Sequence, residues 1–280
     1  MEMCGDQTIR RLVLAFCIMG LGLSNSRAFA ADALSSPWSS GAKSAARLIA
    51  SGTFAGGLYH AGVELKLDPG TLTYWRMPGD AGVPPVFDFG GSANLAKTEV
   101  KFPAPKRFDE GGAQIFGYQG GVIFPLDVTP KDARHPVELS LDLHYATCDQ
   151  ICLPATAKVT LTLLPQPTAG PEADLIAAAR AEVPEVVAAK DGRGFSVSPV
   201  AAAAPSWAVR FSPAPSAAAD LFAEGPEGYF FDTQRAGGFQ LVLAQKPPDA
   251  KGPVPVTLTL VDGATAYQST IRLDVTPATP

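Results

Sequence analysis

The sequence predicts an all-β protein made of two antiparallel β-sandwich domains joined by a short helical linker. Several segments alternate apolar and polar residues with a period of two, as strands with one buried face do. Turn signals recur about every 8–12 residues between these segments, which is the spacing of a sandwich. The chain holds 27 glycines and 26 prolines among 280 residues, which suits many turns and stays below the share typical of disorder.

The first predicted domain covers residues 47–164. Its clearest strand is 137–145, in which odd positions are apolar and even positions are polar, so that one face is buried. Residues 158–163 alternate in the same way after an intervening loop. The other strands expected in this domain are 63–67, 72–75 and 122–128. Residues 31–46 are rich in Ser and Ala, and we expect them to form a flexible lead-in.

The segment 165–190 is predicted to be a proline-rich linker with a short helix. Pro171 suits a first helical position, the Ala-rich stretch 172–181 follows, and Pro184 ends or kinks the helix. The second sandwich is predicted over 191–280 and contains no cysteine. Its expected strands are 207–211, 239–243, 254–261 and 271–275. Residues 253–260 resemble residues 136–143, so the second domain is interpreted as a support or docking copy without a redox centre.

Residues 1–30 have the layout of a secretory signal peptide. Arg10 and Arg11 precede an apolar run of about a dozen residues, shorter than the roughly 20 needed to span a bilayer. The small-x-small pattern at 28–30 predicts cleavage after Ala30. The mature chain is therefore expected in an oxidising compartment, the periplasm, without direct membrane insertion. A net charge of −5 with no basic run gives no electrostatic footprint for nucleic acid.

Cys148 and Cys152 are the two cysteines outside the predicted signal peptide, which holds Cys4 and Cys17. They lie between two alternating strands, so we expect a hairpin connection. An extended chain would separate residues four apart by about 13 Å. Because a disulfide needs Cα atoms within about 7 Å, the loop must fold back. A loop of about five residues stabilises a domain by only roughly 2 kcal/mol, which favours a redox-active pair over a structural staple.

Two other interpretations of the cysteine pair stay open. One is a structural disulfide in a non-catalytic β-sandwich module. The other is a periplasmic copper-binding or copper-delivery protein, in which Cys148, Cys152 and His144 bind copper(I). His144 also fits a solvent-facing strand position, because it falls in the polar phase of its strand. Zinc is disfavoured, since a zinc site needs four ligands and the histidines form no cluster with the cysteines in sequence. No cofactor is predicted.

The stretch 65–164 resembles the N-terminal periplasmic domain of the thiol:disulfide interchange protein DsbD, and looks closest to its ScsB-like or stand-alone relatives. One part of the resemblance is the run 116–126, in which Tyr118 precedes an apolar strand with an internal proline. The other part is 144–155, in which a strand ending in Tyr145 is followed by the two cysteines and Pro154. The resemblance implies an immunoglobulin-like sandwich, which agrees with the strand pattern.

The resemblance also implies a protein-disulfide reductase-like relay. Such a domain accepts electrons from a membrane thiol-electron transporter and reduces periplasmic thioredoxin-like proteins through a mixed disulfide. Cys148 and Cys152 would then be the redox pair, with outward transfer through the more N-terminal Cys148. The acidic Asp149 between them is expected to raise the pKa of a neighbouring thiol.

The sequence departs from the family pattern at two places. The interval between the cysteines is shorter than in DsbD, and segment 108–113 has glycines where the family has an aromatic cap over the thiols. Phe108, Phe116 and Tyr118 are candidates to replace this shield, and Tyr145 with Ile151 to form an apolar docking rim. Phe116 and Tyr118 also fit ordinary core positions.

Overall fold

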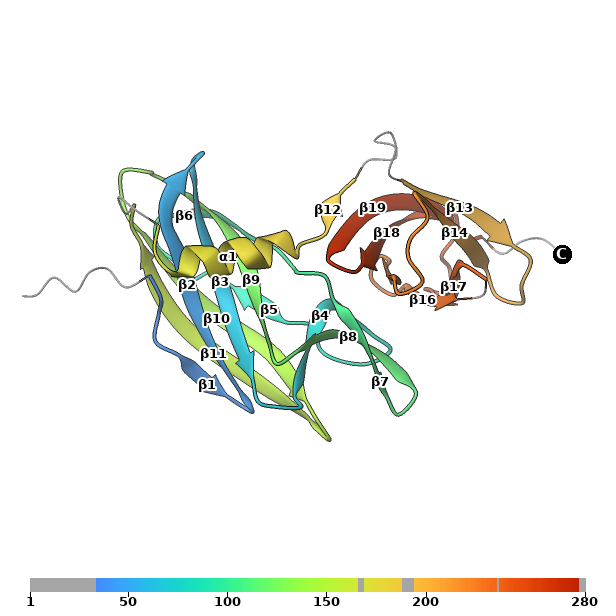
Figure 1. Cartoon of the computed structure of the whole chain (residues 1–280), viewed down its shortest axis with the longest axis horizontal. Helices are drawn as coiled ribbons and strands as arrows, with labels where there is room; N and C mark the ends of the chain where they lie inside the picture. The colour runs from blue at the N-terminus through green and yellow to red at the C-terminus, as the bar shows by residue number, and fades with distance from the viewer. Residues whose placement is uncertain (1–33, 166–168, 188–193, 236, 277–280) are drawn as a thin grey trace, which may run out of the picture. The chain divides into compact units, whose positions relative to one another are not determined.

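The computed structural model describes residues 34–165, 169–187, 194–235 and 237–276. Most of these residues lie in strands, and one α-helix is present among them, as the sequence predicts (Figure 1). The predicted signal peptide with Cys4 and Cys17 lies outside the described residues. Among the residues that are described, no helix is long and apolar enough to cross a membrane.

The first sandwich has two antiparallel sheets, called here sheet A and sheet B. Sheet A has the strand order β1-β2-β3-β9-β6, and sheet B has the order β11-β10-β4-β8-β7, with β5 beside β10. The strands of sheet A are β1 (Ser39–Gly41), β2 (Ser44–Ala55), β3 (Leu58–Leu67), β6 (Leu95–Val100) and β9 (Gly121–Pro130). Those of sheet B are β4 (Leu72–Gly79), β5 (Val86–Asp88), β7 (Lys106–Glu110), β8 (Ala113–Gln119), β10 (Val137–Cys148) and β11 (Cys152–Leu163).

Strands β10 and β11 confirm the period-two prediction. They pair without a bulge from Val137 opposite Leu163 to Cys148 opposite Cys152. The apolar residues of β10 at odd positions are buried and face sheet A across a common core, whereas Glu138 is exposed. This long, regular hairpin delivers both cysteines to one end of the sandwich.

Ordered structure begins earlier than predicted, because β1 and β2 start inside the range 31–46. Strand β1 pairs antiparallel with the beginning of β2, from Ser39 opposite Ala46 to Gly41 opposite Ser44. Just before β1, Trp38 lies under two cations, with Arg47 and Lys66 at 4.7 and 4.4 Å from its ring centroid. Pairing with a neighbouring long strand therefore orders a segment whose Ser/Ala composition alone resembles a loose tail.

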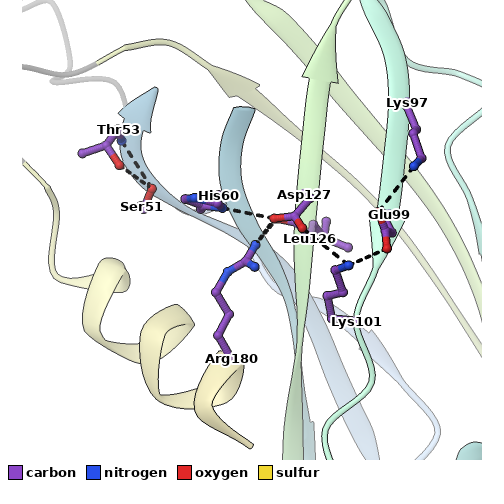
Figure 2. Close-up of polar contacts among 9 residues, drawn as sticks. All are labelled: Ser51, Thr53, His60, Lys97, Glu99, Lys101, Leu126, Asp127 and Arg180. Carbon is purple, nitrogen blue, oxygen red and sulfur yellow. Dashed lines mark hydrogen bonds and ion pairs between the residues drawn. The ribbon is translucent and has the colours of Figure 1, made fainter. Parts of the chain in front are cut away.

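Helix α1 (Glu172–Ala181) forms where the sequence predicts it and packs on sheet A through the buried residues Ile176 and Ala179. Figure 2 shows how its last turn is fastened to β9. Arg180 pairs with the Asp127 carboxylate and donates to the carbonyl oxygen of Leu126 at 2.9 Å. The same carboxylate lies 3.1 Å from Nδ1 of His60. These contacts attach the predicted linker firmly to the first sandwich.

The second sandwich also has two sheets. Sheet C has the order β12-β19-β18-β15, and sheet D has the order β13-β14-β17-β16. The strands are β12 (Glu185–Val186), β13 (Gly194–Val200), β14 (Ser206–Ser212), β15 (Asp220–Glu224), β16 (Phe230–Arg235), β17 (Phe239–Gln245), β18 (Pro253–Asp262) and β19 (Thr265–Asp274). Strand β12 pairs parallel with β19, so the predicted linker contributes an edge strand to this sandwich.

Residues 253–260, which resemble residues 136–143 in sequence, lie in the β18–β19 hairpin, as residues 137–143 lie in the β10–β11 hairpin. Asp262 lies opposite Thr265, so a two-residue turn stands where the first sandwich has its cysteines. Both sandwiches fall within one compact unit of the chain.

Candidate redox site

The tip of the β10–β11 hairpin holds the cysteine pair. Cys148 is the last residue of β10, Cys152 is the first of β11, and the two lie directly opposite each other. They form a disulfide with their Cα atoms 4.1 Å apart. The predicted fold-back of the loop is therefore confirmed, and three residues from Asp149 to Ile151 make the turn.

The two cysteines differ sharply in exposure. Cys148 is fully buried, with an exposed fraction of 0%, whereas Cys152 is exposed. The resemblance to DsbD implies outward transfer through Cys148. In the structure Cys148 belongs to an apolar cluster, and Cys152 is the accessible residue of the pair.

This cluster, called here the cysteine cluster, consists of Leu72, Tyr74, Ile115, Ala146 and Cys148, with Phe108 and Ala113 packed against it. Strand pairing explains its composition. Strand β4 runs antiparallel to β10, with Leu72 opposite Cys148. The hydroxyl of Thr73 fixes this junction by donating to the carbonyl oxygen of Ala146 at 2.8 Å. The cluster therefore joins side chains from β4, β7, β8 and β10 around one sulfur.

Tyr74 is the polar group of the cysteine cluster. Its hydroxyl lies 2.6 Å from Sγ of Cys148 and 3.1 Å from Sγ of Cys152. Burial, and then the nearby negative charge of Glu110, raise the pKa of the Tyr74 hydroxyl above its ordinary value. The group therefore keeps its proton at neutral pH and acts as a hydrogen-bond donor toward sulfur.

Two glycines allow the close packing of the backbone around strand β4 and the Tyr74 ring. A Cβ on Gly117 of β8 would lie 2.0 Å from the carbonyl oxygen of Thr73, so β4 and β8 pair closely only with glycine there. Gly82, at a φ of 126°, lies in the loop after β4, and a Cβ there would lie 2.3 Å from Cε1 of Tyr74. The loop therefore covers the tyrosine ring directly.

Of the four aromatic candidates from the sequence, Phe108 alone packs against the cysteine cluster. Phe116, Tyr118 and Tyr145 lie in the main core instead. The Tyr118 hydroxyl donates to the carbonyl oxygen of Pro103 at 2.8 Å, and the Tyr145 hydroxyl lies 2.7 Å from Oγ of Ser44. Alternation along a strand explains this result, since residues of one parity face the core and those of the other face away from it.

The outer rim of the site is formed by the cysteine turn. Ile151 has an exposed fraction of 64% and is the apolar residue that the turn presents to solvent. Asp149, expected to raise the pKa of a thiol, is paired with Lys43 of the β1–β2 turn at 2.8 Å. The Lys43 ammonium offsets the carboxylate charge next to the sulfurs. The net negative charge at the rim is therefore smaller than the sequence alone suggests.

The structure does not bring His144 to the cysteines. His144 lies four residues before Cys148 in the continuous strand β10, which separates them by about 13 Å along the strand. Its Nε2 lies 3.3 Å from the Asp142 carboxylate, and the side chain is 58% exposed. Among the described residues, no group of three or more His, Cys, Asp and Glu side chains is arranged to hold a metal ion.

Sequence reasoning missed Tyr74, Leu72 and Ile115 as site residues. The segment 72–75 is recognisable as a short aromatic strand, but its place beside the cysteines depends on the long-range pairing of β4 with β10. A tyrosine two residues after Leu72 shares its face of the strand, and this parity is the one local signal that was present.

Three comparisons with known proteins bear on this site. Residues 45–164 match the family model described as "Thiol:disulfide interchange protein DsbD, N-terminal". A solved structure of the N-terminal periplasmic domain of ScsB from Proteus mirabilis has a similar fold, with a TM-score of 0.67 at 18% identity. That alignment covers 87% of this chain and 100% of the ScsB chain, so the shared architecture extends through both sandwiches. No curated protein matches the sequence. The match covers both cysteines and every member of the cysteine cluster, so residues 45–164 are similar to the DsbD N-terminal domain over the whole candidate site.

Proposed function

We propose that this chain is a periplasmic thiol–disulfide relay, which passes reducing equivalents from a membrane thiol-electron transporter to thioredoxin-like proteins through Cys148 and Cys152. The observation that carries the proposal is the pairing of an exposed Cys152 with a buried Cys148 whose sulfur lies 2.6 Å from the Tyr74 hydroxyl. The predicted signal peptide at 1–30 supports the compartment. In this proposal the activity is protein-disulfide reductase-like and needs no cofactor.

The exchange begins when a donor thiolate attacks Sγ of Cys152. A bond forms between the donor sulfur and Cys152, the bond between the two cysteines breaks, and Cys148 leaves as a thiolate. The Tyr74 hydroxyl donates a hydrogen bond to this sulfur and stabilises its charge until it takes a proton. The second donor thiolate then attacks the mixed disulfide and releases Cys152. The donor leaves oxidised, and the chain keeps two electrons as two thiols.

The second half of the cycle runs in the opposite direction. The Cys152 thiolate attacks a partner disulfide and forms a mixed disulfide, which Cys148 resolves by attacking Cys152. The partner leaves with two thiols, and the disulfide of this chain is restored. The exposed Ile151 beside Cys152 supplies an apolar contact for the docked partner.

The equilibrium reduction potential of the pair tests the proposal. We expect a value between about −180 and −270 mV in glutathione buffers, where thiol-exchange proteins lie. Alkylation of each cysteine, followed by peptide mass spectrometry, measures the reduced fraction. A potential below about −300 mV would identify a structural disulfide and overturn the proposal.

Single-cysteine variants test the order of the steps. In Cys148→Ser the remaining Cys152 thiol should react with Ellman's reagent at least about tenfold faster than the Cys148 thiol does in Cys152→Ser, because access limits thiol reactivity. The reverse order would return the entry role to Cys148, against the burial seen in the structure.

A further inference from the structure

In strands β4 and β8 of sheet B, successive residues face two different parts of the molecule, the cysteine cluster and the second sandwich. In β4, Tyr74 belongs to the cysteine cluster, whereas the next residue, Trp75, contacts Phe222 of the second sandwich with ring centroids 5.8 Å apart. In β8, Ile115 belongs to the cysteine cluster, whereas Phe116 contacts the same Phe222 at 4.9 Å. Because successive side chains point to opposite faces, each strand connects the cysteines to the second sandwich.

Strand β7 repeats this pattern with an ion pair. Phe108 packs against the cysteine cluster, and the preceding residue, Arg107, binds β15 of the second sandwich. Its guanidinium donates to both carboxylate oxygens of Asp220 at 3.0 Å. It also donates to the carbonyl oxygen of Leu221 and to the hydroxyl of Thr233, each at 2.8 Å.

The ion pair of Arg107 with Asp220 is partly buried rather than fully exposed to solvent. The side chain of Arg107 is 20% exposed and that of Asp220 is 34% exposed, so both charges are partly removed from water. The guanidinium also lies over the ring of Phe116, 4.7 Å from the centroid. A two-pronged, partly buried Arg–carboxylate contact fixes geometry more strongly than a single exposed ion pair.

The segment held in this way needs outside support. Strands β7 and β8 form a hairpin at the edge of sheet B, called here the cap hairpin, in which β7 pairs with β8 alone among the described strands. Edge segments with few hydrogen-bonded neighbours are the parts of a fold that open most readily. Figure 1 shows β4, β8 and β7 side by side at this edge.

We infer that the second sandwich holds the cap hairpin closed over Cys148, with Arg107 as the positioning residue, and thereby confines exchange to Cys152. The second sandwich then has a task that its lack of cysteines does not reveal. This inference rests on the proposed function only in treating the cysteine pair as the reacting group. Shielding of Cys148 is a property of the folded chain that can be measured without a partner or a reduction potential.

The test uses the full chain carrying Cys152→Ser, in which Cys148 is a buried free thiol. Its alkylation by N-ethylmaleimide, read at Cys148 by peptide mass spectrometry, reports opening of the cap hairpin. Arg107→Ala should raise the labelling rate about five- to tenfold, because the hairpin loses its main polar anchor. Asp220→Asn should raise it in the same direction and add little once Arg107→Ala is present. Amide hydrogens of β7 and β8 should exchange faster in parallel.

Arg47→Ala is the matched control. Arg47 is 19% exposed, pairs with Glu64 at 2.7 Å and lies 4.7 Å from the centroid of Trp38, so it resembles Arg107 in burial, partner and aromatic contact. Its ion pair with Glu64 and its contact with the Trp38 ring both lie within the first sandwich. The inference is overturned if Arg107→Ala leaves the rate within twofold of its parent, or if Arg47→Ala raises it equally. Thermal unfolding of every variant separates local opening from a general loss of stability.

Discussion

Replacing Tyr74 by Phe isolates the contribution of one hydroxyl to the chemistry of the site. The ring of Tyr74 is 2% exposed, and its packing is kept in Tyr74→Phe, whereas the contacts of 2.6 and 3.1 Å to the two sulfurs are lost. The contact matters most when Cys148 leaves as a thiolate, because hydrogen bonds to charged groups contribute about 1.5–3 kcal/mol against about 0.5–1.5 for neutral ones.

The free energy lost in the transition state of disulfide reduction should therefore exceed the free energy of unfolding that is lost. A loss of about 1.5–3 kcal/mol in the transition state corresponds to a rate roughly 10- to 100-fold slower. The assay follows reduction by dithiothreitol at neutral pH, quenched by alkylation at successive times. Stability, measured by chemical denaturation of the oxidised chain, should fall by only about 0.5–1.5 kcal/mol.

Tyr145→Phe is the control for this experiment. Tyr145 is 3% exposed and also loses one hydroxyl contact, to Ser44 at 2.7 Å, but its hydroxyl does not touch the sulfurs. Its variant should keep the rate of the parent chain. Equal rates for Tyr74→Phe and Tyr145→Phe would refute the role given to Tyr74.

Two further predictions concern the support of the site and of the helix. Gly82→Ala introduces a Cβ 2.3 Å from the Tyr74 ring, so it should lower the unfolding temperature and alter the near-ultraviolet dichroism. Gly57→Ala has a similarly positive φ with no atom within 4 Å of the new Cβ, and an equal change there would mean backbone strain alone. Burial raises the pKa of Asp127, but Arg180 and nearby cations outweigh it and lower the net value. Its charge therefore stabilises the fold fully above about pH 4, and this contribution is lost as the pH falls through the lowered folded-state pKa. Asp127→Asn should flatten the loss of stability on acidification, and parallel denaturation curves would contradict this.

Local sequence patterns were sufficient to predict the main strands and the position of the cysteine pair between two of them. The alternation over 137–145 and 158–163 predicted the hairpin, and Pro171 with the Ala-rich run predicted helix α1 at Glu172–Ala181. These features depend on residues close in sequence, whose periodicity carries the information. The identity of the cysteine cluster depends on which strands pair, and no local pattern specifies that β4 lies against the end of β10.

The aromatic candidates also show that local sequence patterns do not determine long-range strand pairing. Phe108 and Phe116 both lie near the expected cap, and both are large and apolar. Strand register places Phe108 toward the cysteines and Phe116 toward the second sandwich. A shift of register by one residue would exchange them, so their roles follow from pairing and not from residue type. Strand order explains why Cys148 is buried and Cys152 is not, because β10 lies between β4 and β11, whereas β11 is the edge strand of sheet B.

The register of the β10–β11 hairpin has a consequence for how partners sense this chain. Cys148 and Cys152 are the last of twelve directly opposed residue pairs, so the remaining eleven hold the two strands together when the sulfurs separate. We therefore expect reduction to move side chains at the tip while the backbone of the hairpin stays in place. The oxidised and reduced proteins should then present nearly the same surface outline. A partner that distinguishes the oxidised protein from the reduced one must then do so through the reactivity of the Cys152 sulfur, because the shape of the hairpin is nearly the same in both states.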